Sequence, residues 1–303
     1  MKKLRSEKNL QVYVDNFKKF ISAMPTENLS KKISEKTGED KTYVHTTLET
    51  YINEQKSALN FLHPFLTCRN TRILEIGAGL CILSLFLKKE GFNITALEPT
   101  TGGFDFFSTF QKIIIDYYKE IPLTVLSYPA QELEEKQVGK FDLIFSFNVI
   151  EHIPNPFYTL RVLLNIMNEQ GKMVHACPNY LIPYDPHFGI PVLATWPGLS
   201  SFFFRKKISD NKELWNSLNF ITSSRVKKFA TQHDLVIKFP RGLLAESYIR
   251  LQEDPIFRER QKNIFVMIFS IVIQLPGGLN LLKKLPPTCS TPMQFIISKR
   301  STM

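Results

Sequence analysis

Short apolar runs alternate with helix-spaced segments between residues 72 and 180, and this alternation constrains the fold more than any other feature. The strand-like runs lie at 72–76, 93–98, 123–128, 141–147 and 172–177. Helical spacing separates them, at 80–89, 105–119 and 157–167. Several of the strands are apolar on both faces, which is typical of a parallel sheet buried between helices. We therefore predict an α/β fold with a mostly parallel sheet and helices on both faces.

The rest of the chain predicts the domain organisation. Helical spacing without a strand pattern fills the first 66 residues, prolines predict loops over 181–222, and 242–284 predicts helices with breaks. Further strand patterns lie at 235–239 and 293–299. The predicted parts are an N-terminal helical region (1–66), a core (67–180), an insertion or cap that contains a sixth strand near 235–239 (181–292), and a final strand of the core sheet (293–303).

The first predicted strand ends in a turn with two glycines, Glu75-Ile76-Gly77-Ala78-Gly79. Ligands of open parallel sheets bind at the carboxyl ends of the strands, and glycines let a ligand approach the backbone closely. The dinucleotide fingerprint G-x-G-x-x-G needs a further glycine at position 82, where this chain has Ile82. The second strand ends in Glu98, where a carboxylate can accept both hydroxyls of a ribose. Together these features predict a nucleoside ligand without a pyrophosphate, such as S-adenosylmethionine (SAM), and leave an NAD-dependent dehydrogenase as the alternative.

Three segments resemble class I SAM-dependent methyltransferases: ILEIGAGLCILSLFL at 73–87, ITALEP at 94–99 and FDLIFSFNVIEHIPNP at 141–156. The most similar group is that of the small-molecule and lipid methyltransferases, which includes the ubiquinone and menaquinone enzymes. The resemblance covers about residues 70–180 and extends loosely to 293–299, which would supply the family's antiparallel C-terminal edge strand. It implies a Rossmann-like methyltransferase fold with SAM as the cofactor.

The resemblance also implies which residues hold the methionine and ribose parts of SAM. Glu75 and the turn formed by Gly77, Ala78 and Gly79 would hold the methionine end. Glu98 would bind the ribose hydroxyls.

Two further contacts follow from the same resemblance. Asn148, which ends the fourth strand, would face the methionine portion of SAM. Near the adenine, Pro129 stands where the family often has an acidic residue, so the backbone of Ala130 or the side chain of Gln131 would supply that contact.

The candidate catalytic residues are His187, His152 and Tyr184. Methyl transfer from a sulfonium is an in-line displacement, for which orientation alone can supply about 7–11 kcal/mol. A base is needed only when an O–H or N–H acceptor must lose a proton. We predict that His187 abstracts or orients this proton, in a polar cluster with Tyr184 and Asp185 on the loop after the fifth strand. The alternatives are a structural helix-cap role for His152 and a loop that is merely rigid.

The region 181–292 exceeds what the sheet needs and is the predicted substrate-binding cap. It combines FFFRKK at 202–207, an apolar run at 264–275 and LLKK at 281–284. Aromatic clusters beside basic pairs suit an amphiphilic or lipid-linked acceptor, and also contact with an anionic membrane. A cap that packs its phenylalanines against the core is the alternative.

The net charge of +10 lies mostly in residues 181–303, where 17 basic residues less 8 acidic ones leave +9. Such an excess indicates nucleic acid, anionic lipid or an anionic substrate. No RNA-binding module is visible, and the basic residues are scattered, which favours a small molecule over RNA. An RNA methyltransferase and a non-catalytic SAM-binding protein remain as alternatives.

The cysteines, the histidines and the length of the apolar runs limit which other classes of protein the chain can belong to. The four cysteines are widely spaced without a CxxC pair and the six histidines are dispersed, so free thiols and no metal site are predicted. The apolar run at 264–275 is shorter than the roughly 20 residues of a spanning helix. The N-terminus lacks the apolar stretch of a secretory signal. We predict a cytoplasmic protein that contacts a membrane at its surface at most.

Overall fold

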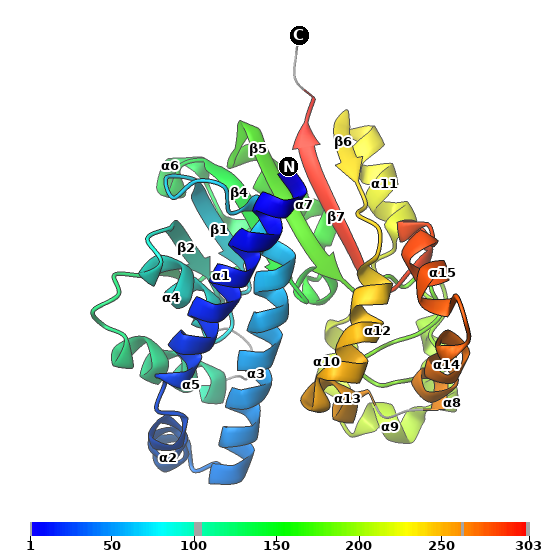
Figure 1. Ribbon diagram of the computed structural model, residues 1–303, viewed down its shortest axis with the longest axis horizontal. Helices are drawn as coiled ribbons and strands as arrows, with labels where there is room; N and C mark the ends of the chain where they lie inside the picture. Colours follow the sequence, from blue (N-terminus) through cyan, green and yellow to red (C-terminus); the bar gives the residue numbers. More distant parts are fainter. Residues whose placement is uncertain (1, 100–104, 262–263, 301–303) are drawn as a thin grey trace. The chain divides into compact units, whose positions relative to one another are not determined.

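The structure is a computed structural model, and it describes residues 2–99, 105–261 and 264–300 (Figure 1). The chain divides into two compact units. The first unit comprises Met1–Phe145 with Asn165–Gly171, and the second comprises Ser146–Leu164 with Lys172–Met303. Seven strands form one sheet in the order β3-β2-β1-β4-β5-β7-β6. The four sequence ranges predicted as domains stay a prediction, and residues 301–303 of the last range lie outside the described residues.

Three helices begin the first unit and confirm the helices predicted before residue 66. They are α1 (Lys2–Ser22), α2 (Thr26–Thr37) and α3 (Lys41–Leu62), followed by a 3-10 turn, η1 (His63–Phe65). The side chain of Asp40 caps α3 by accepting the Tyr43 N–H at 2.9 Å. Aromatic rings attach α1 to the rest of the unit, since the Phe17 ring lies 5.0 Å from that of Phe86 and the Phe20 ring lies 5.0 Å from that of Tyr118.

The predicted parallel strands are confirmed in the first unit. It contains β1 (Arg72–Ile76), β2 (Asn93–Leu97), β3 (Thr124–Leu126) and most of β4 (Phe141–Phe147). The helices between them are α4 (Ile82–Lys89), α5 (Asp105–Tyr117) and α6 (Glu135–Val138), with a 3-10 turn, η2 (Ala130–Glu132). β2 pairs in parallel with β1 and with β3, and Ile76 is opposite Leu97. This register brings the residues that follow β1 and β2 to the same edge of the sheet.

The second unit completes the sheet with antiparallel pairs. It includes η3 (Ile150–His152), most of α7 (Pro156–Asn165) and of β5 (Met167–Cys177), β6 (Leu235–Lys238) and β7 (Met293–Lys299). β7 runs antiparallel to both β5 and β6 and lies between them, so the C-terminal strand is one position in from the edge that β6 forms.

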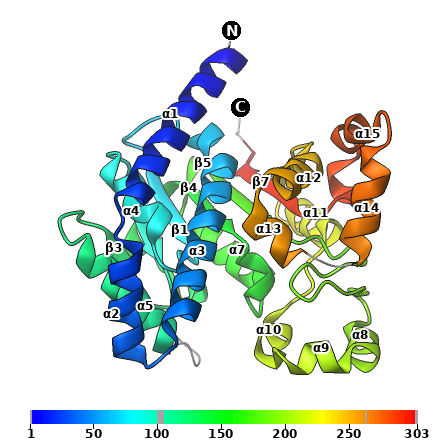
Figure 2. The ribbon, with the colours of Figure 1, turned by 60° about the horizontal axis from the view of Figure 1, so that its bottom comes forward.

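Helices fill most of the second unit between β5 and β7 (Figures 1 and 2). They are α8 (Pro197–Phe203), α9 (Arg205–Ser209), α10 (Lys212–Ser217), α11 (Ser223–Gln232), α12 (Leu243–Glu253), α13 (Pro255–Arg260), α14 (Ile264–Gln274) and α15 (Gly278–Lys284). A last 3-10 turn, η4 (Pro287–Cys289), precedes β7. The prediction of loops over 181–222 is confirmed for 181–196 and 218–222, but it is wrong for most of 197–217, which forms α8, α9 and α10. Pro197 occupies the first turn of α8, where a proline is tolerated.

The apolar run at 264–275 forms α14 and leaves much of its surface exposed. The side chains of Met267, Ile268, Ile271 and Val272 are between 52% and 60% exposed. Among the described residues, no single helix is both long and apolar enough to cross a membrane. One broken pair meets the same requirement on length and composition, namely Val266–Gln274 with Gly278–Lys284, which bend by 108°.

Candidate active site

The turn after β1 has a backbone that glycine alone adopts easily. Gly77 and Gly79 have positive φ angles of 69° and 53°. The N–H groups of Gly77 and Ala78 both donate to the carbonyl oxygen of Leu97, at 2.8 and 3.1 Å, and so fasten the turn to the end of β2. A Cβ atom on Gly79 would lie 3.1 Å from the ring of Tyr51 on α3. Position 79 therefore accepts a larger residue only if the ring moves and the backbone is strained.

Two carboxylates lie at this turn. Glu98 follows β2 and accepts the N–H of Gly79 at 2.7 Å. Glu75, near the end of β1, is buried and accepts the hydroxyl proton of Ser84. Burial raises the pKa of Glu75 to about 8, the Ser84 hydrogen bond lowers it, and the charge of Glu98 raises it further. Burial also raises the pKa of Glu98, against the hydrogen bond from Gly79.

The residue after the glycines also belongs to this turn. Cys81 is buried with a positive φ of 59° and precedes α4. The side chain of Gln111 donates to the carbonyl oxygen of Gly79 at 2.6 Å and approaches the Cys81 sulfur to 3.4 Å. Of the residues predicted near the adenine, Ala130 is buried and Gln131 half-buried, both in η2.

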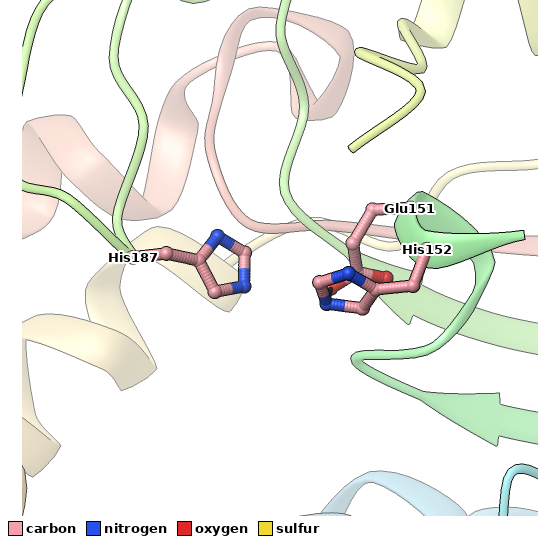
Figure 3. Close-up of side chains that lie close together, drawn as sticks. All are labelled: Glu151, His152 and His187. Atoms are coloured by element: carbon pink, nitrogen blue, oxygen red, sulfur yellow. Dashed lines mark ion pairs between the residues drawn. The ribbon is translucent and has the colours of Figure 1, made fainter. Parts of the chain in front are cut away.

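The second unit contains a polar cluster around η3, made of Glu151, His152, Asp185 and His187. Figure 3 shows three of its members, Glu151, His152 and His187. The cluster follows Asn148, whose φ is 55° and whose N–H donates to the Ala176 carbonyl oxygen at 2.9 Å. The side chain of Glu151 is fully buried, and neither of its carboxylate oxygens accepts a hydrogen bond from the part of the chain that the structure describes. Burial raises the pKa of Glu151 to about 7, while the charge of His187 lowers it.

Asp185 holds one histidine of the cluster in place. The Nδ1 atom of His187 lies 3.2 Å from Oδ2 of Asp185, and the same oxygen accepts the hydroxyl proton of Tyr180 at 2.7 Å. The other oxygen accepts the Phe188 N–H at 2.7 Å. Burial alone raises the pKa of Asp185, but the hydrogen bonds from His187, Tyr180 and Phe188 outweigh it and hold the pKa below its usual value.

His152 is the second histidine of the cluster. Its Nδ1 atom lies 2.8 Å from Oγ of Ser217, and its Nε2 atom lies 3.9 Å from Oε1 of Glu151. The rings of His152 and His187 meet edge to face, with centroids 5.2 Å apart. Burial lowers the pKa of His152 to about 4, and the charge of His187 lowers it further. The imidazole of His152 is therefore neutral at neutral pH.

A buried amide anchors the loop that carries Asp185 and His187. The Nδ2 atom of Asn179 donates to the carbonyl oxygens of Thr288 and Ser290, at 3.0 and 2.9 Å. Its Oδ1 atom accepts the N–H groups of Leu181 and Ser223, at 3.2 and 3.0 Å. All four hydrogen-bonding positions of the amide are used.

The structure brings some of the predicted catalytic residues together and adds others. His152 and His187 are neighbours, and Asp185 contacts His187 as predicted. The tyrosine hydroxyl that reaches Asp185 belongs to Tyr180 rather than to Tyr184, whose N–H donates to the Ile182 carbonyl oxygen.

Two members of this site were not predicted as site residues. Glu151 could have been suggested by its place beside His152, since a carboxylate in a strongly apolar sequence needs a partner. For Tyr180 the sequence holds no signal that its ring, rather than that of Tyr184, turns toward Asp185.

Comparisons with known proteins define the class. The family model described as a methyltransferase domain matches residues 37–214, which is more than half of the chain. An uncharacterised protein of Mycobacterium tuberculosis is 33% identical over 235 residues, which cover 75% of this chain and 78% of that protein. A ubiquinone biosynthesis O-methyltransferase of Coxiella burnetii is 22% identical over 123 residues, or 40% of this chain and 49% of that protein.

Solved structures are also similar to the chain. Phosphoethanolamine N-methyltransferase 2 of Haemonchus contortus, in complex with S-adenosyl-L-methionine, aligns with a TM-score of 0.48 and 14% identity. The alignment covers 81% of this chain, which spans about half (52%) of that protein's length. The plantazolicin methyltransferase BpumL, in complex with SAH, aligns over 97% of both chains with a TM-score of 0.42 and 12% identity.

The chain thus belongs to the methyltransferase domain family. It is a SAM-dependent methyltransferase with a Rossmann-like fold, which confirms the resemblance found in its sequence. The dehydrogenase alternative is accordingly wrong.

The residues at the turn of the first unit fit SAM. A carboxylate has about four lone-pair positions, and Glu98 uses one of them for Gly79, which leaves positions for ribose hydroxyls. SAM carries a positive sulfonium and a positive ammonium group, whose charge favours the ionised form of the buried Glu75. When bound, SAM supplies the activated methyl group, and the residues of the chain supply its position.

Proposed function

We propose that the protein transfers the methyl group of SAM to an oxygen or nitrogen atom of a small, amphiphilic acceptor. The observation that carries this proposal is the cluster of Glu151, His152, Asp185 and His187 in the second unit. Methyl transfer needs a proton acceptor only if the attacking atom bears a proton, as a hydroxyl or an amine does. Two neighbouring histidines beside two carboxylates can act as such proton acceptors.

A lone pair of the acceptor atom attacks the methyl carbon, and the bond between that carbon and sulfur breaks with its electron pair remaining on sulfur. The sulfonium thereby becomes the neutral thioether of S-adenosylhomocysteine. The proton of the acceptor moves to Nε2 of His187, while Asp185 stabilises the positive charge through its contact with Nδ1. Within this scheme His152 and Tyr184 remain candidates for orienting the acceptor.

The residues of the first unit hold the methyl donor in this proposal. Glu75 with Gly77, Ala78 and Gly79 would hold the methionine end, and Glu98 would accept the ribose hydroxyls, as its position beside Gly79 supports.

Three further donor contacts stay predictions. Ala130 and Gln131 would contact the adenine. Asn148 would contact the methionine portion, and its left-handed backbone after β4 is the unusual local geometry that often marks a functional position.

Exposed apolar side chains next to basic ones support an amphiphilic acceptor and contact with an anionic membrane. Trp196, Phe202 and Phe203 are 69–77% exposed, and α9 follows them with the sequence RKKIS. Ile271 and Leu275 are 60% and 62% exposed at the end of α14, and α15 ends in two lysines. Exposed aromatic and aliphatic side chains beside basic ones are typical of segments that lie at an anionic membrane interface.

The alternative of a cap whose phenylalanines pack on the core applies to part of the FFFRKK segment. Phe204 packs against the cluster of Tyr180, Phe188 and Trp215. Phe202 and Phe203 point to solvent and contact each other.

The class of acceptor is tested by labelling. Cell extract separated into lipid, small-molecule, RNA and protein fractions is incubated with methyl-labelled SAM and either the wild-type protein or His187→Ala. Label is expected in the lipid or small-molecule fraction with the wild type and to be strongly reduced with His187→Ala. His63→Ala, which alters a histidine on η1 in the other unit, is the matched control and should behave as wild type. Label in RNA alone would instead support the RNA methyltransferase, and full activity of His187→Ala would exclude the proposed base.

The ubiquinone biosynthesis O-methyltransferases among the relatives are named for transfer to oxygen. Product analysis by mass spectrometry distinguishes a methyl ether from a methylamine and so decides between an oxygen and a nitrogen acceptor.

A further inference from the structure

We propose that Glu151, His152 and His187 form a binding site for one divalent transition-metal ion, with Zn²⁺ as the best match. One ligand atom from each of the three side chains lies within 4.8 Å of the other two. Figure 3 shows the two imidazole rings turned toward each other, with the Glu151 carboxylate beside them. The inference deepens the proposed function, on which it rests for the role of the metal but not for metal binding itself.

Hydrogen bonds fix the tautomer of His152. The hydroxyl of Ser217 donates its single proton to the Leu214 carbonyl oxygen at 2.8 Å. In the contact of 2.8 Å with His152, Oγ of Ser217 must therefore accept, so Nδ1 of His152 carries the proton. The lone pair of the neutral ring is then on Nε2, which lies on the side of Glu151.

The tautomer of His187 is fixed in the same way. Both oxygens of Asp185 accept a hydrogen bond, one from the Tyr180 hydroxyl and the other from the Phe188 N–H, as an ionised carboxylate does, and such a carboxylate has no proton to donate. Nδ1 of His187 must therefore donate to it, which leaves the lone pair of the neutral ring on Nε2. A hydrogen bond from the non-ligating nitrogen to a carboxylate or another oxygen is the usual support of a metal-binding histidine. Both histidines have this support.

The third ligand is the buried carboxylate of Glu151. Neither oxygen accepts a hydrogen bond from the described residues, although its side chain is fully buried. A buried polar group without a partner is costly, and native structures rarely tolerate one without a functional reason. A cation at this position would satisfy the carboxylate and hold it ionised.

The ligand set favours zinc over hard cations. Two imidazoles and one carboxylate occur in catalytic zinc sites, whereas Ca²⁺ and Mg²⁺ prefer oxygen ligands. Ligand atoms at tetrahedral zinc lie about 3.3 Å apart, so the three side chains must approach one another on binding. Three protein ligands leave a fourth position open, as catalytic sites require. The side chain of His187 is 22% exposed, which provides access from solvent.

A metal in this site changes how the acceptor loses its proton. The lone pair on Nε2 of His187 cannot bind a metal and accept a proton at the same time. Glu151, His152 and His187 would hold the metal, and at the open position the metal would supply a lowered pKa to an acceptor hydroxyl, whose proton would then pass to solvent. His187 is the base in the metal-free protein alone.

The test uses the full chain after removal of bound metal with a chelator. Zn²⁺ is titrated by calorimetry, and Co²⁺ is followed by its visible absorption. We expect one ion per chain, at least about 100-fold weaker binding in Glu151→Gln and in His187→Ala, and 10–100-fold weaker binding in Asp185→Asn, which removes only the support of His187. His63→Ala should bind as tightly as wild type.

Three outcomes would overturn the proposal. The first is that neither ion binds saturably. The second is that His187→Ala and Glu151→Gln both bind the metal with unchanged affinity. The third is a thiolate charge-transfer band with Co²⁺, which would assign the metal to the exposed Cys68 or Cys289. Thermal unfolding of each variant identifies any that does not fold, and His187→Ala changes a loop side chain with the least effect on the core. SAM binding is measured on the same samples. If the wild type binds Zn²⁺ but does not bind SAM, the proposed function is refuted and the proposed metal site is supported.

Discussion

Replacement of Glu75 by glutamine should stabilise the ligand-free protein at alkaline pH and weaken SAM binding. The side chain is 4% exposed and its pKa is raised from 4.5 to about 8, first by burial and then by the charge of Glu98. A raised carboxyl pKa contributes stability that is complete below pH 4.5 and is lost as the pH rises through 8. In the wild type, folding therefore becomes less favourable across this interval because the folded chain must either retain a proton or bury a charge.

The size of the effect follows from the shift. At 1.36 kcal/mol for each pH unit, the loss is about 3 kcal/mol at pH 7 and approaches about 5 kcal/mol above pH 8, as an upper bound. Glutamine keeps an oxygen that can accept the Ser84 hydroxyl and carries no titrating group. Urea unfolding should accordingly show Glu75→Gln to be more stable than wild type at pH 8.5 and nearly equal at pH 4.5.

Two results would refute this reasoning about Glu75. One is a stability difference of the same size at both pH values, and the other is a difference that also appears in Glu132→Gln, an exposed carboxylate of the same unit. SAM binding supplies an independent check. If the cationic ligand favours the ionised carboxyl, binding near pH 7 should release a proton, which calorimetry in buffers of different ionisation enthalpy measures. The release should disappear in Glu75→Gln.

Three other predictions concern the turn, the cluster and the surface. Gly79→Ala should lower the free energy of unfolding by about 1–2 kcal/mol, measured by denaturant unfolding, because an L residue is strained at a φ of 53° and the new methyl group contacts the ring of Tyr51. Adding Tyr51→Ala to this variant should remove the contact but leave the backbone strain. In the metal-free protein, His187→Ala should bind SAM as wild type does and lose a factor of about 10²–10⁴ in kcat, so unchanged turnover would contradict the role of His187 as the base. Phe202→Ser with Phe203→Ser should reduce sedimentation with anionic vesicles by at least about tenfold, since each ring contributes roughly 1.5–3 kcal/mol on burial, whereas Val12→Ser, at an exposed site on α1, should have no effect.

The sequence predicted the parallel strands well because each one is a short apolar run with a clear end. The strand predicted at 141–147 matches β4 residue for residue, and the one predicted at 293–299 matches the antiparallel β7 equally well. Gly77, Gly79 and Glu98 could be grouped for the same reason, since the ends of adjacent parallel strands must meet at one edge.

The polar cluster could be predicted only in part because it depends on loops. His152 and His187 are 35 residues apart in the sequence, and their contact depends on how the chain after β5 turns back. That path is set by the hydrogen bonds of Asn179 with segments more than 40 residues away, which no local pattern reveals. The helices α8 to α10 were missed because prolines were interpreted as breaks, whereas Pro197 begins a helix.

The route of the chain between the two units has a consequence for dissecting the protein. The polypeptide passes from one unit to the other after Phe145, after Leu164 and after Gly171, so neither unit is a continuous stretch of sequence. A gene fragment ending at residue 180 would lack β7, which pairs with β5 from Met173 to Cys177. Without β7, the edge of β5 would expose a row of unpaired N–H and carbonyl groups, which promotes self-association. Deletion from the C-terminal side is thus expected to yield insoluble material rather than a minimal SAM-binding module.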